Sequence, residues 1–261
     1  MLGAIIGDIV GSVYEFHNIK TKEFELFSSE SHFTDDTILT CATAEWLLTD
    51  KNPKDILKKW GTYYVKRNYE NGKIAAFGKG FMNWLETGVP YEAKTNGCVM
   101  RISPIGLMEN DLKTALLKAE ELTNLTHNHS ESLTAVRAYI ETMFLAKKRI
   151  APPKIKEIIS NKYGYDLSKS VDEIRPNYNK FYVRCKNSVP QAIISALDAT
   201  SYEDAIRNAV SLGGDSDTLA CMAGGIAEVI FKIEPTIIQK AMPILDARMQ
   251  KVIKEFYSKI R

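Results

Sequence analysis

The chain has 261 residues, of which 45% are hydrophobic and 25% charged, ordinary values for a soluble globular protein with a substantial core. Its formal net charge is +2 and no basic stretch stands out, which excludes the composition typical of a nucleic-acid-binding protein. The apolar N-terminus has no basic leader and reaches Asp8 early, so it does not suit a signal peptide or a membrane span, and we expect a cytoplasmic protein that binds no membrane.

The first predicted element is a buried helix over residues 2–13, built from small and aliphatic residues. Glycines occupy positions 3, 7 and 11, and this four-residue spacing forms a ridge along which another helix can approach closely. Glu15 follows the helix, between Tyr14 and Phe16. A surface location is the simplest interpretation of Glu15 taken alone.

Two acidic clusters begin apolar helices. After an irregular polar stretch over 17–33, the letters TDDT at 34–37 precede apolar positions at helical spacing. The letters GGDSDT at 213–218 repeat this design near the other end of the chain. Helix capping explains either cluster alone, because Asp, Ser and Thr are favoured at helix N-termini. Two such clusters favour a metal site, since crowded carboxylates repel one another without a cation and oxygen ligands suit Mg²⁺, Mn²⁺ or Ca²⁺ rather than zinc.

After the first cluster, helices are predicted over 53–69, 73–85 and 111–123. A loop covers 86–95, and the small-residue turn NGCVMR at 96–101 leads to a short helix that Pro104 opens. An Asn-Gly pair usually marks only a tight turn. The alternative is that the backbone N–H groups of this turn cradle phosphates.

The histidines and cysteines do not predict a soft-metal site. His127 and His129 precede a long amphipathic helix that begins after Ser130, and no third soft ligand lies near them in the sequence. They are interpreted as loop histidines that hydrogen-bond a neighbour or a ligand. The cysteines are scattered without a Cys-x-x-Cys pair, which predicts reduced and mostly buried thiols at Cys41, Cys98, Cys185 and Cys221.

The least patterned region follows Pro152-Pro153 and runs over 161–187, where several tyrosines indicate a segment that folds over the body of the protein. Four further helices are predicted over 189–198, 202–211, 216–232 and 235–259. No stretch of the sequence shows sustained period-two alternation, and helical spacing recurs throughout. The sequence therefore predicts an all-α, compact helical bundle with one domain over 1–261.

Taken together, these motifs resemble the ADP-ribosylglycohydrolase family. The matches follow the family's order and are spread along the chain: GAIIGDIVGS at 3–12 with Glu15, FTDDT at 33–37, NGCVMRISP at 96–104, Thr126-His127, and LGGDSDT at 212–218. The two acidic motifs are the specific part of this resemblance, and their co-occurrence in one chain makes an accidental match hard to sustain.

The resemblance implies a metal-dependent hydrolase that cleaves the glycosidic bond between ADP-ribose and an acceptor, with two divalent cations, Mg²⁺ or Mn²⁺, in a binuclear centre. It assigns six residues to the metals: Thr34, Asp35, Asp36, Asp215, Asp217 and Thr218. It places the substrate-binding residues around the ADP-ribose: Asn96, Gly97, Cys98, His127, Gly213, Gly214 and Ser216. The expected partner is an ADP-ribosylated substrate, with a protein side chain favoured over a nucleic acid or a small molecule, and a monomer is favoured.

Cleavage at an anomeric carbon passes through an oxocarbenium-like state, so a carboxylate must activate water or protonate the leaving group. The candidates are Glu15, with aromatic neighbours expected to raise its pKa by desolvation, and then Asp36. Many family members have a Ser-x-Gly-Asn-Gly loop, whereas Ala93 and Thr95 stand at its Ser and first Gly positions. A hydroxyl contact to phosphate is therefore missing or supplied by Thr95. The alternatives are an ADP-ribose-binding module without turnover and a two-metal nucleotide phosphohydrolase.

Overall fold

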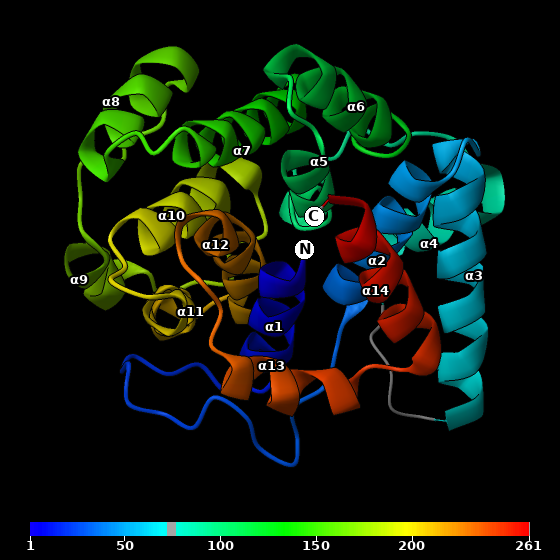
Figure 1. Cartoon of the computed structure of the whole chain (residues 1–261), viewed down its shortest axis with the longest axis horizontal. Coiled ribbons are helices and arrows are strands. Elements are labelled where there is room, and N and C mark those ends of the chain that lie inside the picture. Colours follow the sequence, from blue (N-terminus) through cyan, green and yellow to red (C-terminus); the bar gives the residue numbers. More distant parts are fainter. Residues whose placement is uncertain (72–76, 261) are drawn as a thin grey trace.

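The computed structural model describes residues 1–71 and 77–260, and helices build the fold, while the residues in these ranges form no strand (Figure 1). The all-α prediction is therefore confirmed. In chain order the α-helices are α1 (Leu2–Gly11), α2 (Asp35–Leu48), α3 (Pro53–Asn71), α4 (Lys79–Thr87), α5 (Ser103–Met108), α6 (Leu112–Asn124), α7 (Ser130–Lys147), α8 (Pro152–Tyr163), α9 (Val171–Ile174), α10 (Cys185–Leu197), α11 (Tyr202–Leu212), α12 (Ser216–Ile230), α13 (Pro235–Ala241) and α14 (Ala247–Ile260). Short 3-10 helices are η1 (Asn96–Cys98), η2 (Arg175–Asn177) and η3 (Met242–Ile244).

The centre of the molecule is the contact between α1 and α12, which lie side by side in Figure 1. Every residue of α1 is buried. A Cβ placed on Gly7 would lie 2.0 Å from the carbonyl oxygen of Ala220, and one on Gly3 would lie 2.4 Å from that of Gly224. The glycine ridge therefore brings the two backbones into direct contact, and other side chains would not fit there.

The remaining helices pack around this central pair. Helices α7, α10 and α11 contact α12 on one side, while α2 contacts α1 and is itself covered by α3 and α14. The buried hydrophobic side chains form one cluster that extends from Met1 to Phe256. None of the helices within the described ranges is long and apolar enough to cross a membrane. All four cysteines are free and buried, as their spacing predicts.

The C-terminal region differs from the prediction of one helix over 235–259. After α13 the chain changes to the short 3-10 helix η3, in which Pro243 cannot donate a backbone hydrogen bond, and α14 starts only after Asp246. The Asp246 carboxylate accepts a hydrogen bond of 3.0 Å from the backbone N–H of Met249 and so stabilises the new helix start. One periodic pattern thus covers two helices, because its apolar positions continue across the break.

Other helices also differ from the sequence-based expectation. Helix α8 is not predicted, because its buried face rests on Ile155 and Ile159 alone after a Pro-Pro pair. Helix α10 begins at Cys185, four positions before the predicted start, and Pro190 lies inside it. Of the predicted helix over 73–85, residues 73–76 lie outside the described ranges, and α4 begins at Lys79.

The α1–α12 contact generates a stability prediction. Replacing Gly7 with Ala should lower the free energy of unfolding by about 3 kcal/mol or more, because the new methyl group forces two packed backbones apart. Urea denaturation followed by circular dichroism would measure this change. Gly78→Ala is the matched control, since a Cβ there meets nothing within 4 Å, and its effect should stay within about 0.5 kcal/mol. Equal stability of the two variants would contradict the close contact.

Candidate functional site

The two predicted acidic clusters meet in one cavity of about 440 Å³. Asp36 and Thr218, which are 182 positions apart in the sequence, are joined by a hydrogen bond of 3.3 Å from the threonine hydroxyl to the carboxylate. The predicted site residues that line this cavity are Glu15, Asp35, Asp36, Asn96, Gly97, His127, Asp215, Asp217 and Thr218. The fold therefore brings together carboxylates from the segment after α1, the start of α2 and the start of α12.

The start of α2 is held by Asp8, a fully buried carboxylate of α1. Asp8 accepts hydrogen bonds from the backbone N–H of Thr34 at 2.9 Å, from the Thr34 hydroxyl at 2.7 Å and from the backbone N–H of Thr37 at 3.0 Å. The Thr34 hydroxyl oxygen also accepts a 3.3 Å bond from the N–H of Asp36. The capping interpretation thus holds for Thr34, which does not line the cavity. Its role as a metal ligand stays a prediction.

The start of α12 is shaped by Gly213 and Gly214, both with positive φ near 74°. The Asn18 side chain makes two hydrogen bonds to the backbone of Gly214. Its amide N–H donates to the Gly214 carbonyl at 3.1 Å, and its carbonyl oxygen accepts from the Gly214 N–H at 2.7 Å. Asp215 occupies the N-cap position but makes no capping bond to the described backbone of α12. Its carboxylate instead accepts a 2.6 Å bond from the Asn96 amide, so capping does not explain Asp215.

Two carboxylate oxygens of the cavity have no hydrogen-bond donor among the described residues. Within the described part of the chain, one oxygen of Asp36 and one of Asp217 are buried without any partner. One oxygen each from Glu15, Asp215 and Asp217 lie within 4.8 Å of one another. Because a buried anionic oxygen without a donor is costly, this arrangement fits a bound cation, with oxygen as the sole donor type in the group.

The carboxylates raise one another's pKa values. Burial, and then the negative charges of Asp215 and Asp8, raise the pKa of Glu15 to about 7. Burial and the same two charges also raise the pKa of Asp35 to about 7. The expected rise in the Glu15 pKa by desolvation is therefore confirmed, although one of its two aromatic neighbours, Phe16, is exposed to solvent. The cavity itself and its crowded negative charge shift this pKa.

Another part of the cavity lining consists of polar groups around a buried cation, Arg101. Buried Arg101 donates a 2.7 Å bond to the Thr126 hydroxyl, which lies 2.8 Å from Nδ1 of His127, and Nε2 of His127 lies 3.0 Å from the Thr95 hydroxyl. Burial and the nearby Arg101 charge lower the pKa of His127 to about 3, so its ring is neutral. We assign Nδ1 as the acceptor from Thr126 and Nε2–H as the donor to Thr95. The Thr95 hydroxyl hydrogen is then available to a ligand.

Four predicted substrate-binding residues do not line the cavity. Cys98 is buried with its Sγ 3.8 Å from that of Cys185, and the Ser216 hydroxyl donates to the Gly11 carbonyl at 3.0 Å. The other two are the glycines at 213 and 214, which face Asn18 and neighbouring groups. These residues therefore lie outside the cavity lining, and their direct contact with substrate stays a prediction.

Sequence reasoning missed three parts of this region: Asp8, Asn18 and the cavity-lining pair Phe181 and Val183. Asp8 carries a usable signal, because a charge inside an otherwise apolar helix must find a buried partner. Asn18 and residues 178–183 lie in irregular segments, where no periodicity indicates which side chains face inward.

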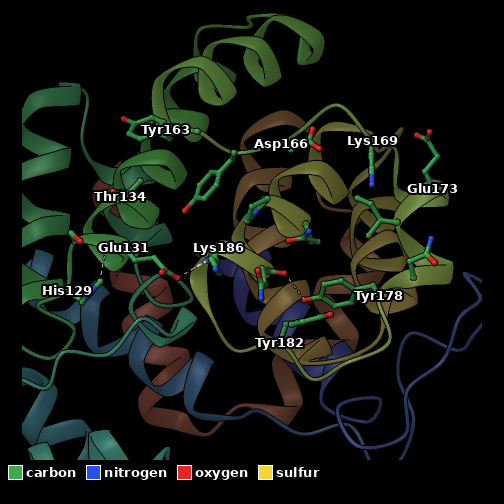
Figure 2. A pocket seen from close by; sticks show the side chains of 18 residues that line it. His129, Glu131, Thr134, Tyr163, Asp166, Lys169, Glu173, Tyr178, Tyr182 and Lys186 are labelled. Carbon is green, nitrogen blue, oxygen red and sulfur yellow. Dashed lines mark hydrogen bonds between the residues drawn. The ribbon is translucent and has the colours of Figure 1, made fainter.

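A second and larger cavity, of about 730 Å³, lies beside the first and shares none of its described lining residues. Figure 2 shows Tyr163, Tyr178 and Tyr182 around it. Its acidic side chains all have partners: Glu131 pairs with Arg184, Asp166 accepts from Ser168, and Glu173 accepts from Ser170. The smaller cavity is therefore the candidate active site, because the unpartnered carboxylates lie there.

Comparisons with known proteins show which family the chain resembles along its length. The sequence profile of the family described as ADP-ribosylglycohydrolase matches residues 1–234. The chain is 24% identical to the ADP-ribosylarginine hydrolase Tri1 of Pseudomonas putida (strain GB-1), in an alignment that covers 99% of this chain and 77% of that protein. It is 25% identical to the ADP-ribosylhydrolase ARH3 of Xenopus tropicalis, with 87% and 84% covered.

A solved structure described as an ADP-ribosylglycohydrolase-related protein complex has the same fold. Its TM-score is 0.72 at 20% sequence identity, and the superposition covers 100% of this chain and 96% of that chain. At that identity the likeness concerns the fold, while the family match rests on the sequence itself. Because that match spans most of its length, the chain belongs to the ADP-ribosylglycohydrolase family.

Proposed function

We propose that this protein is a metal-dependent hydrolase that cleaves the glycosidic bond between ADP-ribose and an acceptor. The observation that carries the proposal is the convergence of carboxylates from three segments in one cavity, with buried oxygens of Asp36 and Asp217 left without partners among the described residues. The names of the relatives, an ADP-ribosylarginine hydrolase and ADP-ribosylhydrolases, support the same reaction class.

The residues present fit two divalent cations of the Mg²⁺ or Mn²⁺ type. The proposed ligands, all oxygen donors, are Thr34, Asp35, Asp36, Asp215, Asp217 and Thr218. Bound cations would order the ribose hydroxyls and stabilise negative charge on the attacking oxygen. Asp8 and Asn96 position this set, because Asp8 holds the backbone at the start of α2 and Asn96 orients the Asp215 carboxylate.

Glu15 is our first candidate for the acid–base step. It is half-buried, belongs to the irregular segment after α1 and lines the cavity beside Asp215 and Asp217, where a carboxylate can exchange a proton with a bound substrate or water. Asp36 is the second candidate. Its carboxylate lies deeper and already accepts the Thr218 hydroxyl, so it suits a ligand role better.

One assay separates the proposal from its two alternatives. Release of ADP-ribose from a modified peptide supports the hydrolase. Binding of ADP-ribose without release from any modified substrate supports a binding module, and release of phosphate or of a mononucleotide from ADP-ribose supports a phosphohydrolase.

Removal of divalent cations should abolish turnover. We expect exhaustive EDTA treatment to stop ADP-ribose release and added Mg²⁺ or Mn²⁺ to restore it, because the carboxylates would again carry bound counter-charges. Liquid chromatography of the released ADP-ribose measures both steps. Full activity after metal analysis has shown the absence of divalent cations would contradict the metal-dependent reaction.

Replacement of Asp215 with Asn should weaken cation binding at least roughly tenfold, because it removes one ligand charge while it keeps the shape of the side chain. The rise in melting temperature that Mn²⁺ gives the wild-type protein should shrink accordingly, since a bound ligand stabilises the folded state by mass action. Differential scanning calorimetry with and without Mn²⁺ measures this effect.

Asp166→Asn is the matched control for that experiment, because its carboxylate is exposed and bonds only to Ser168 within the described contacts. It should keep the wild-type response to Mn²⁺. Loss of the helical circular dichroism signal in Asp215→Asn would instead indicate a structural role for Asp215.

Thr95 should contribute to ADP-ribose binding. Thr95→Val removes the hydroxyl that His127 orients, and we expect roughly 3- to 10-fold weaker binding of ADP-ribose, the effect of one lost hydrogen bond. Isothermal titration calorimetry measures the dissociation constant. Thr114→Val, which changes a hydroxyl bonded to Asp111 at the start of α6, should bind as the wild type does. Unchanged binding by Thr95→Val would show that its hydroxyl does not meet the ligand.

A further inference from the structure

Two buried thiols from distant parts of the chain are in contact beside the candidate active site. The Sγ atoms of Cys98 and Cys185 lie 3.8 Å apart, although the two residues are 87 positions apart in the sequence. Cys98 is the last residue of η1, and Cys185 is the first residue of α10. The proposed hydrolase reaction does not use either thiol, so their contact needs its own explanation.

The backbones that carry these thiols are held together by hydrogen bonds. The Asn96 N–H donates to the Val183 carbonyl at 2.8 Å, and the Cys185 N–H donates to the Lys94 carbonyl at 2.8 Å. The sulfur atoms of a disulfide lie about 2.05 Å apart, so the present separation must fall by about 1.8 Å for a bond to form. Rotation of the two side chains supplies part of this movement, and a shift of η1 toward α10 supplies the remainder.

Each thiol is next in sequence to a residue that lines a cavity. Gly97 precedes Cys98 and lines the smaller cavity, which holds the carboxylates and is called the carboxylate cavity below. Lys186 follows Cys185 and lines the larger cavity (Figure 2). The sulfur contact therefore lies in the wall between the two cavities, although both thiols are themselves buried. A hydroperoxide is small enough to enter either cavity, and only a local opening of this wall separates it from sulfur.

The two thiols differ in their readiness to react. The thiolate, rather than the thiol, attacks an oxidant. Burial raises the pKa of Cys98, but the hydrogen bond from Cys185 and the charge of buried Arg101 outweigh this effect, so the pKa of Cys98 is lowered. The hydrogen bond to Cys98, and then burial, raise the pKa of Cys185. Cys98 is therefore the thiol that reacts first, and Cys185 is placed to react with its oxidised form.

We propose that Cys98 and Cys185 form a reversible disulfide, and that this modification weakens cation binding in the carboxylate cavity. The second part rests on the proposed function. The Cys98 thiolate attacks hydrogen peroxide and becomes a sulfenic acid, and the released hydroxide takes up the proton that the thiol has lost. The Cys185 thiol then attacks this sulfur, and the sulfenic oxygen leaves as water when the S–S bond forms. Two thiols thus lose two electrons, and one hydrogen peroxide becomes two water molecules.

The short helix η1 connects this bond to the acidic cluster. The Cys98 thiol donates to the Thr95 carbonyl at 3.3 Å, and a disulfide removes that donor. The Asn96 carbonyl accepts from the Val99 N–H at 2.7 Å, so η1 is a closed turn that moves as a unit. Because the Asn96 amide donates to the Asp215 carboxylate at 2.6 Å, a shift of η1 toward α10 displaces a proposed cation ligand.

The test exposes the folded protein to hydrogen peroxide, which catalase then removes before any metal is added. Mass spectrometry of the intact protein should show the loss of two hydrogen atoms, and a digest without reductant should join the peptides that contain Cys98 and Cys185. Isothermal titration calorimetry should show a dissociation constant for Mn²⁺ that is roughly 10-fold higher in the oxidised protein, the size of effect expected when the partner of a ligand is displaced. Dithiothreitol, removed before the titration, should restore both the mass and the affinity.

Cys185→Ser should form no such bond and should keep the Mn²⁺ affinity of the reduced protein after the same treatment, and Cys185→Ala replaces it if the serine variant does not fold. Cys41→Ala is the matched control, because Cys41 is buried and its sulfur has no hydrogen-bond contact with another cysteine in the described chain, so this variant should respond as the wild type does.

Absence of the Cys98–Cys185 bond in treated wild-type protein would overturn the inference and leave the sulfur contact as packing alone. Unchanged Mn²⁺ affinity in protein that carries the bond would also overturn it. Reduced wild-type protein that binds no Mn²⁺ would contradict the proposed function, and the second part of the inference with it, whereas the mass measurement would still decide whether the disulfide forms. The two failures are therefore distinguishable.

Discussion

The direct backbone contact between α1 and α12 is the constraint on which the site depends. A Cβ on Gly11 would lie 2.5 Å from the Cα of Asp217, so the glycine ridge continues up to the acidic start of α12. On the same helix, Asp8 binds the backbone at the start of α2. One helix therefore sets the distance between two acidic clusters that are remote in sequence, and any separation of α1 from α12 would open the site.

This arrangement conflicts with stability when the cavity holds no cation. Buried carboxylates at the helix starts have pKa values raised by burial and by one another, which shows that their charged forms are disfavoured there. A cluster of buried carboxylates keeps its arrangement only where the rest of the fold fixes the positions of these side chains. Here the apolar cluster around α1 and the hydrogen bonds of Asp8 and Asn18 provide that support.

The sequence could predict the fold class and the two acidic clusters because both have local signals, namely helical periodicity and a repeated polar pattern at helix starts. It could not separate the motif residues that line the cavity from those that hold the helix starts. Thr34 and Ser216 belong to the motifs, yet the first caps α2 and the second binds the Gly11 carbonyl. Asp8, by contrast, lies inside an apolar helix and positions the start of α2. Only its hydrogen bonds to Thr34 and Thr37 reveal this role. The helix break at Pro243 could not be predicted for a related reason, because the apolar periodicity of the sequence continues from α13 into α14.

Residues 178–183 contribute side chains to both cavities. No periodic pattern in their sequence predicts which side chain faces which cavity. Tyr178 and Tyr182 line the larger cavity, whereas Phe181 and Val183 line the carboxylate cavity. The segment is tied to the core at its ends, so its exposed side chains can change with little effect on the carboxylates. In our proposal the chemistry thus resides at helix starts that α1 holds in place, while a connecting segment supplies another part of the cavity lining. This division is the one expected when a rigid scaffold presents variable loops at its active site.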